Sequence, residues 1–256
     1  AGLGEVAPGF HFNTSPPMIV GNAAIVGGFV LDNMATDEPS GVVRAFDALT
    51  GRKLWSWDAG LRNPNAAPGP DGGYARGSPN VWSLISADEK LGLVYLPTGN
   101  PTPDHFGGQR SPEKERYGSS VVALEAATGK LRWSFQTVHH DLWDYDVASQ
   151  PVLIDLPIDG QIVPALIQGT KQGEIFLLDR RTGRTLGPVV ERPVPQGNVP
   201  GERYSPTQPV SLALPSLNPP PLREADMWGA TPLDQLWCRI AFRRLRYLGR
   251  FTPPSL

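Results

Sequence analysis

The chain has 256 residues, of which 40% are hydrophobic, and its formal net charge at pH 7 is −2. Such a chain is long enough to bury a large core. It lacks the basic surplus of a nucleic-acid-binding surface, so no nucleic acid partner is expected. Glycine and proline occur 28 times each, which is typical of a fold with many turns and stays below the share that marks disorder.

Neither the cysteine content nor the hydropathy of the sequence indicates a cellular compartment. The single cysteine, Cys238, cannot form an internal disulfide, so the usual link between paired cysteines and secretion does not apply. The longest apolar stretch, 18–31, is too short to span a membrane and is interrupted by glycine and asparagine, so it indicates a hairpin. The sequence shows no signal peptide, and we expect it to be an excerpt of a longer protein.

Short runs rich in Val, Leu, Ile and aromatic residues recur along the chain, each bounded by Gly, Pro, Asn or Asp. This pattern is typical of strands in an all-β fold. Long irregular insertions separate some of the runs, chiefly 62–78 and 100–117, and loops of that length are usually functional or disordered. The predicted strands are 24–30, 42–47, 53–57, 81–86, 92–97, 120–125, 131–136, 152–155, 163–168 and 174–179.

One sequence phrase occurs three times: an apolar run, an acidic residue, two spacers, then Thr-Gly and a basic residue. The acidic side chain can cap a turn and glycine supplies a positive φ, so each copy predicts a β-hairpin. Copies at irregular, blade-sized intervals indicate small antiparallel sheets arranged around an axis, the blades of a β-propeller. The acidic residues are Asp47, Glu125 and Asp179, and in the first two copies a tryptophan, Trp55 or Trp133, follows the glycine by four residues.

The C-terminal part of the chain has a different character. From 192 to 222 it is rich in proline without a sustained period, which predicts an extended surface connection. Thr231-Pro232 then offers a cap and a first helical residue, and apolar residues follow at helical spacing, so we expect one short helix over 231–248. Arginines make this segment basic; they form a solvated face, or they contact anionic lipid or a partner.

The segment 139–146 concentrates three carboxylates, two imidazoles and two aromatic rings in eight residues. Clustered carboxylates repel one another unless a cation, a donor or a proton relieves them, which favours a functional site over an acidic loop in water. Adjacent histidines point in different directions, so a two-histidine metal site is not expected here. Lys171 stands in a glycine-flanked turn, where a lysine taken alone is usually exposed to solvent.

Several motifs carry a resemblance to a known family. The run Thr-Val-His-His-Asp-Leu-Trp-Asp at 137–144, with 116–120, 193–197 and 225–231, resembles the membrane-bound quinoprotein dehydrogenases that oxidise glucose, quinate or shikimate with pyrroloquinoline quinone (PQQ). The similarity extends over practically the whole chain, and the separation of Asp144 from Lys171 matches the family pattern. The family fold is an eight-bladed propeller, so the resemblance implies that 1–256 forms about half of one.

The resemblance also implies roles for individual residues. Asp144 matches the catalytic base that takes the substrate's hydroxyl proton while a hydride passes to C5 of the quinone, and Lys171 matches the lysine beside the quinone oxygen. Trp82 matches the indole on which PQQ stacks, and an ordinary core tryptophan is the less favoured alternative. Thr102 matches a polar position near the cofactor, or it serves only its loop.

A divalent cation completes the implied site. Asp32, Asn33 and Asp144 match the positions that hold it, although Asp32-Asn33 alone is more typical of a plain turn. A set of oxygen ligands suits Ca²⁺ or Mg²⁺ rather than zinc. The cation would polarise the C5 carbonyl as a Lewis acid, and Lys171 would reinforce it.

The implied activity is the oxidation of a sugar such as D-glucose, aldose to lactone, with electrons passed to ubiquinone at the periplasmic face of the inner membrane. The same motifs fit a dehydrogenase of quinate, shikimate or another cyclic polyol. A non-catalytic propeller scaffold is the alternative from another class. Membrane attachment would come through segments outside this chain, and we expect the chain alone to be inactive because half a ring lacks the remaining cofactor contacts.

Overall fold

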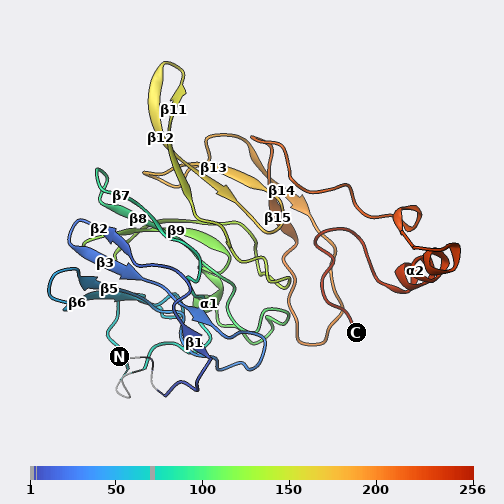
Figure 1. The fold of residues 1–256 in the computed structure, drawn as a ribbon, viewed down its shortest axis with the longest axis horizontal. Helices are drawn as coiled ribbons and strands as arrows, with labels where there is room; N and C mark the ends of the chain where they lie inside the picture. The colour runs from blue at the N-terminus through green and yellow to red at the C-terminus, as the bar shows by residue number, and fades with distance from the viewer. Residues whose placement is uncertain (1–2, 4, 70–72) are drawn as a thin grey trace.

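The computed structural model describes residues 3, 5–69 and 73–256, so part of the insertion at 62–78 lies outside the described residues. Two four-stranded antiparallel sheets follow one another in the chain (Figure 1), each built from strands consecutive or nearly so in sequence. This arrangement is that of propeller blades. The first sheet contains β2 (Met18–Val20), β3 (Ala23–Val26), β5 (Val43–Asp47) and β6 (Lys53–Trp57); the second contains β7 (Ser86–Asp88), β8 (Leu93–Pro97), β9 (Ser120–Glu125) and β10 (Leu131–Gln136).

Smaller sheets complete the described fold. The hairpin of β11 (Val152–Ile158) and β12 (Gln161–Gly169) projects from the body at the top of Figure 1. The helix α2 (Pro232–Arg244) lies at the right, beyond β14 (Val189–Pro193) and β15 (Thr207–Ser211). The fold is thus all-β with few helices, a partial propeller as predicted. The remaining elements are β1 (His11–Phe12) paired with β4 (Phe29–Val30), β11 (Val152–Ile158) with β12 (Gln161–Gly169) and β13 (Ile175–Asp179), β14 (Val189–Pro193) with β15 (Thr207–Ser211), α1 (Pro112–Glu115), the 3₁₀ helix η1 (Glu224–Asp226) and α2 (Pro232–Arg244).

The repeated sequence phrase forms the same turn each time. In the first copy the Asp47 carboxylate accepts hydrogen bonds from the Thr50 backbone and hydroxyl, each 2.8 Å long. In every copy the glycine N–H donates to the carbonyl of the acidic residue at 2.8 Å, and the glycine has a φ of 70–72°. The first two copies join β5 to β6 and β9 to β10, as the sequence predicts.

The tryptophans that follow the first two turns connect neighbouring sheets. Trp55 donates its indole N–H to the carbonyl of Ala126 at 2.9 Å, in the turn of the second copy. Trp133 does the same to Arg180 of the third copy at 3.1 Å. A Cβ on Gly129 or Gly183 would lie 2.6 Å from the tryptophan ring. The phrase therefore needs glycine twice over, for its backbone conformation and for the ring that packs on it.

Two apolar clusters fill the spaces between successive sheets. Val43, Trp57 and Leu124 belong to the first cluster, which joins the β2–β6 sheet to the β7–β10 sheet. Tyr95 and Phe176 belong to the second, which continues to the β11–β13 sheet. Each of these sheets therefore buries its apolar side chains against the next sheet, which is the packing of a propeller.

Three sequence predictions need correction. The strand predicted at 24–30 divides into β3, which ends at Val26, and β4, which pairs with β1 in another sheet. Of the strand predicted at 81–86, only Ser86 enters a strand, while Val81 makes an isolated bridge to Gly28. Here the Ser83 hydroxyl donates to the Ala148 carbonyl, so the segment bonds to a loop instead of a sheet ladder. The prediction of a purely extended connection over 192–222 is also wrong in part, because β15 pairs there with β14; in a sheet of two strands each has a free edge, and proline is tolerated on such edges.

The predicted helix lies within its expected range, 231–248. The Thr231 hydroxyl accepts the N–H of Asp234, and the Asp234 carboxylate accepts the N–H of Thr231, a reciprocal cap. No α2 residue is buried, and Leu233 and Trp237 are strongly exposed. Among the helices of the described residues, none is long and apolar enough to cross a bilayer.

Candidate active site

The loop after β10 and the turn after β12 bring Asp144 and Lys171 together. The Lys171 ammonium lies 3.0 Å from Oδ1 of Asp144 and donates a second hydrogen bond of 2.9 Å to the Asp144 carbonyl. Asp144 holds a left-handed backbone conformation, φ 59°. This geometry costs free energy in a residue other than glycine, and such costs concentrate at functional sites. The two residues that the sequence pairs as base and lysine are therefore in direct contact.

Trp82 lies on the other side of the same ammonium. The Lys171 Nζ is 5.7 Å from the centroid of the indole ring, within cation–π range. The indole N–H donates to Oδ2 of Asp146 at 2.8 Å, and that carboxylate also lies 3.5 Å from the Lys171 ammonium. Asp146 thus fixes the plane of the indole and shares the lysine with Asp144.

These side chains face a hollow of about 390 Å³, a size typical of small-molecule sites. The aromatic pair Phe12 and Phe29, with ring centroids 4.6 Å apart, forms another wall. The short β1–β4 sheet holds the two rings together, because Phe12 is the register partner of Phe29. The hollow is lined by Phe12, Thr14, Phe29, Asp32, Trp82, Asp144, Asp146 and Lys171.

Negative charge accumulates around the hollow. Burial and the charge of Asp144 raise the pKa of Asp32. Burial raises the pKa of Asp146 to about 6, with Lys171 acting against this shift and Asp144 adding to it. Farther back, burial and the carboxylates of Asp32, Asp146 and Asp144 raise the pKa of Asp104 to about 8. Asp104 is therefore largely protonated at neutral pH. The carboxyl groups of Asp32, Asp144 and Asp146 still outnumber the single ammonium at the hollow, and an additional cation would relieve this imbalance.

Two predicted site residues lie away from the hollow. Asn33 faces Asp104, with its amide N–H donating to Oδ2 at 2.6 Å and its carbonyl oxygen accepting the Asp104 backbone N–H at 2.9 Å. Thr102 is buried against Gly77, where a Cβ would come within 2.8 Å of the threonine hydroxyl. That hydroxyl has no hydrogen-bond partner among the described residues. Neither side chain lines the hollow.

The sequence left other residues of the site unassigned. Asp146 belongs to the acidic run at 139–146, so carboxylate density was a usable signal for it. Asp104, Phe12 and Phe29 come from segments with no distinguishing pattern, and they reach the site by long-range pairing. No local motif could have identified them.

Blade-like sheets define the class of this protein as a β-propeller, here with a carboxylate–ammonium pair beside an aromatic-lined hollow. The family model described as "PQQ: Glucose/ethanol/alcohol dehydrogenase, beta-propeller domain" matches residues 1–256. The chain belongs to this family of PQQ-dependent dehydrogenases, as its motifs suggested.

Curated relatives share about half of their aligned residues with the chain. It is 51% identical to the glycerol dehydrogenase large subunit of Gluconobacter oxydans (strain 621H), over 100% of this chain and 35% of the relative. It is 51% identical to the quinoprotein glucose dehydrogenase of Escherichia coli (strain K12), over 98% and 31%. It is 46% identical to the quinate/shikimate dehydrogenase (quinone) of Acinetobacter baylyi (strain ATCC 33305 / BD413 / ADP1), over 99% and 32%. The chain spans about a third of these relatives.

Solved structures agree on the fold. The quinohemoprotein alcohol dehydrogenase from Comamonas testosteroni matches with a TM-score of 0.57 and 26% sequence identity, over 78% of this chain and 31% of that one. The likeness supports the partial propeller described above. It covers less than a third of the solved chain, so the described sheets correspond to one sector of a larger ring.

The hollow fits the family's cofactor. Trp82 offers a flat indole face, the Phe12–Phe29 pair offers another apolar wall, and Lys171 offers a donor between the aromatic and acidic sides. PQQ is itself an acid, and the carboxylates here would repel it without a bridging cation. For that cation the fit is partial: within the described ranges no three His, Cys, Asp or Glu side chains are close enough together to hold a metal ion. Asp32 and Asp144 present carboxylate oxygens at the hollow, but two side chains are fewer than a complete set of ligands.

Proposed function

We propose that the protein carrying this chain oxidises a hydroxyl group of a sugar such as D-glucose, aldose to lactone, with PQQ as cofactor. The observation that carries this proposal is the contact of 3.0 Å between Asp144 and Lys171 on the wall of a hollow that Trp82 also lines. A base, a cationic donor and a stacking face occupy one small volume. A non-catalytic scaffold has no need of this combination.

Each residue has a distinct task in the proposed reaction. The Asp144 carboxylate is 40% exposed, so a substrate hydroxyl can reach it and transfer its proton to it. The Lys171 ammonium, placed between that carboxylate and the indole, donates a hydrogen bond to an oxygen of the bound cofactor and stabilises negative charge there. PQQ, when bound, supplies the two-electron acceptor for the hydrogen that leaves the substrate carbon. Ca²⁺ or Mg²⁺ would be held by Asp32 and Asp144, with Asn33 and Thr102 proposed to turn toward the bound groups.

A polyol is the second candidate substrate. The chain is as similar to a glycerol dehydrogenase subunit as to a glucose dehydrogenase, and it is 46% identical to a quinate/shikimate enzyme. The residues described here handle a hydroxyl group and do not discriminate among its carriers. We propose ubiquinone as the electron acceptor and the periplasmic face of the inner membrane as the location, with attachment through segments outside this chain.

The substrate is tested with the full-length protein, loaded with PQQ and either Ca²⁺ or Mg²⁺. We expect glucose to reduce an artificial dye with a higher kcat/KM than glycerol or quinate, because the proposed reaction is aldose oxidation. A soluble ubiquinone analogue should replace the dye as acceptor. A higher kcat/KM for glycerol or quinate would select the polyol enzyme. If the folded, PQQ-loaded protein oxidises none of the three, the scaffold alternative holds.

Removal of the divalent ion should abolish activity. The carboxylates at the hollow exceed its single ammonium, so PQQ binding should weaken when a chelator takes the ion away. The measurement is dye reduction and PQQ retention after EDTA treatment, followed by addition of Ca²⁺, Mg²⁺ or K⁺ alone. Ca²⁺ or Mg²⁺ should restore both quantities and K⁺ neither. Full activity in excess EDTA would show that no exchangeable ion takes part.

A further inference from the structure

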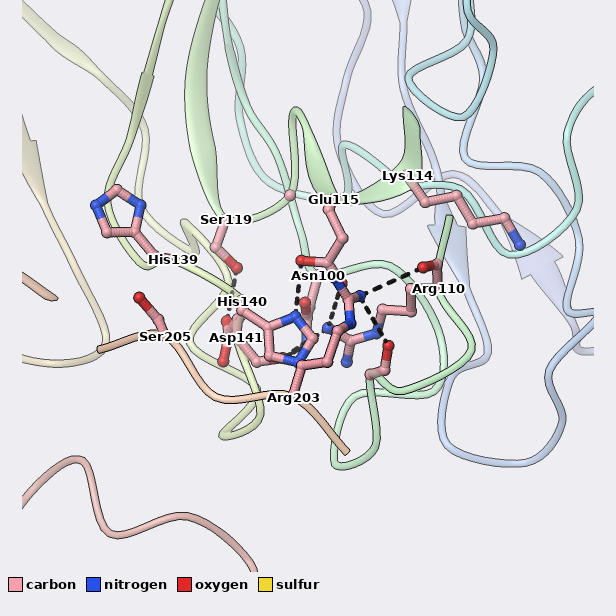
Figure 2. Close-up of polar contacts among 12 residues, drawn as sticks. Asn100, Arg110, Lys114, Glu115, Ser119, His139, His140, Asp141, Arg203 and Ser205 are labelled. Atoms are coloured by element: carbon pink, nitrogen blue, oxygen red, sulfur yellow. Dashed lines mark hydrogen bonds and ion pairs between the residues drawn. The ribbon is translucent and has the colours of Figure 1, made fainter. Parts of the chain in front are cut away.

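His140 lies between the carboxylates of Glu115 and Glu202, in the loop that leads from β10 to Asp144; Figure 2 shows His140 beside Glu115. Its Nδ1 is 3.2 Å from Oε2 of Glu115, and its Nε2 is 3.0 Å from Oε1 of Glu202. The His140 side chain is 10% exposed and that of Glu202 only 2%. Figure 2 shows the ring of the neighbouring His139 pointing away from this cluster. The two adjacent histidines therefore have different surroundings.

The geometry determines the charge on His140. A neutral imidazole has a single N–H, so one of its nitrogens would turn a lone pair toward a carboxylate oxygen. With oxygens of Glu115 and Glu202 facing both nitrogens, only the imidazolium satisfies both contacts. Burial opposes this charge, but the hydrogen bonds and charges of Glu115 and Glu202 outweigh it and raise the pKa of His140 above its usual value.

The cluster joins three segments of the chain. The second oxygen of Glu202 accepts the backbone N–H of Gly107 at 2.6 Å, so the segment before β15 is attached to the long insertion at 100–117. Arg110, in that insertion, lies 3.3 Å from Glu115 and donates a bond of 2.7 Å to the carbonyl of Asp141. Asp141, the residue after His140, is thus also bound by the insertion.

Asp141 transmits this anchoring to the base. Its carboxylate accepts the backbone N–H of Trp143 at 2.9 Å and that of Tyr145 at 2.8 Å, the two residues that flank Asp144. The Ser119 hydroxyl donates to the same carboxylate at 2.6 Å. These bonds fix the backbone on both sides of the left-handed Asp144. The backbone conformation of Asp144 therefore depends on the position of the Asp141 carboxylate.

We propose that His140 is a positioning residue for Asp144: held between Glu115 and Glu202, it anchors the segment from which Asp141 fixes the base. This inference rests on the proposed function for the role of Asp144, whereas the anchoring itself does not. His140 touches no part of the hollow, so its effect on the reaction passes entirely through the loop.

The anchor depends on pH. His140 is faced by Glu115 from α1 and by Glu202, while Arg110, Arg203 and the Asp141 carboxylate complete the charged groups around it. Its usual pKa is about 6.5, and the folded value is higher. The stabilisation is therefore complete below about pH 6.5 and is lost as the pH rises through the folded pKa. Rising pH should loosen the loop and lower kcat.

The test replaces His140 in the full-length protein. At pH 6, His140→Gln should lower kcat about 10- to 100-fold, because a small displacement of a catalytic group has effects of this size. The KM should change less than about twofold, because the substrate contacts remain. In the apoprotein, the amide hydrogens of residues 143 and 145 should exchange faster, which mass spectrometry of 139–147 measures without any cofactor. His139→Gln is the matched control, because the His139 side chain is 35% exposed and its partners, Gln136 and the 50% exposed Glu191, lie outside the His140 cluster.

A second variant tests whether the anchoring requires the positive charge of His140. Glu202→Gln keeps the shape of the side chain but removes one of the charges that hold the imidazolium, so the alkaline fall of kcat and the rise of exchange at 143 and 145 should both move to lower pH. Wild-type exchange rates and kcat in both variants, or equal effects of His140→Gln and His139→Gln, would overturn the proposal. If His140→Gln does not fold, Glu202→Gln decides. An inactive wild-type protein would refute the proposed function, while exchange in the apoprotein would still decide the anchoring.

Discussion

Asp144→Asn in the full-length protein should lower kcat by about 10²- to 10⁴-fold, the usual contribution of a general base. The amide keeps the shape of the carboxylate and can still accept the hydrogen bond from Lys171, which is 3.0 Å long in the native pair. It cannot take the proton of the substrate hydroxyl. PQQ binding should remain largely intact, because Trp82 and Lys171 are unchanged. Dye reduction and cofactor titration measure the two effects separately.

Asp159→Asn is the matched control for this experiment. Asp159 also has a left-handed backbone, φ 49°, in the turn between β11 and β12, so both substitutions place asparagine in the same conformation. Its side chain lines none of the active-site hollow, and the variant should keep wild-type kcat. Loss of PQQ binding in Asp144→Asn, with full activity per bound cofactor, would contradict the assignment of Asp144 as the base.

The hairpins were predictable from sequence because every determinant is local. The caps at Asp47 and Glu125, and the glycines with positive φ, act within a few residues. Strands 53–57, 120–125 and 131–136 match β6, β9 and β10 for the same reason. The failure at 81–86 has the opposite cause: Trp82 and Ser83 bond to the loop after β10, and no local pattern contains that information.

The site residues likewise divide into those that the sequence indicated and those that depend on contacts between distant segments. The pairing of Asp144 with Lys171 came from a resemblance, since nothing in a turn lysine alone predicts a carboxylate 3.0 Å away. Asp104 and the Phe12–Phe29 pair enter through contacts between distant segments, which a single sequence does not encode locally. Asn33 bonds to Asp104, and Thr102 is buried against Gly77 with no partner for its hydroxyl among the described residues, so neither side chain lines the hollow that the resemblance assigned to them.

The second large effect is expected on stability, from the loss of Trp133, which connects two neighbouring sheets. Trp133→Ala should lower the free energy of unfolding of the full-length protein by about 3–5 kcal/mol, the cost of removing a buried tryptophan. Trp133 is 8% exposed, packs on Gly183 and Tyr95, and donates its indole N–H to the carbonyl of Arg180. Its removal leaves a void between two sheets and takes away one of the two hydrogen bonds that the Arg180 carbonyl accepts, the other coming from the Tyr95 hydroxyl at 3.0 Å. Urea or thermal unfolding, followed by tryptophan fluorescence, measures the loss.

Two further variants separate packing from hydrogen bonding. Trp133→Phe keeps a ring over Gly183 but lacks the N–H. It should lose about 0.5–1.5 kcal/mol, the net contribution of one hydrogen bond, because the Arg180 carbonyl keeps its bond from the Tyr95 hydroxyl. Trp228→Ala makes the same chemical change as Trp133→Ala at a side chain that is 77% exposed, and its effect should stay within about 0.5 kcal/mol. If Trp133→Ala costs no more than Trp228→Ala, the tryptophan after the Thr-Gly turn does not join the blades, and the apolar clusters between the sheets must hold them together without it.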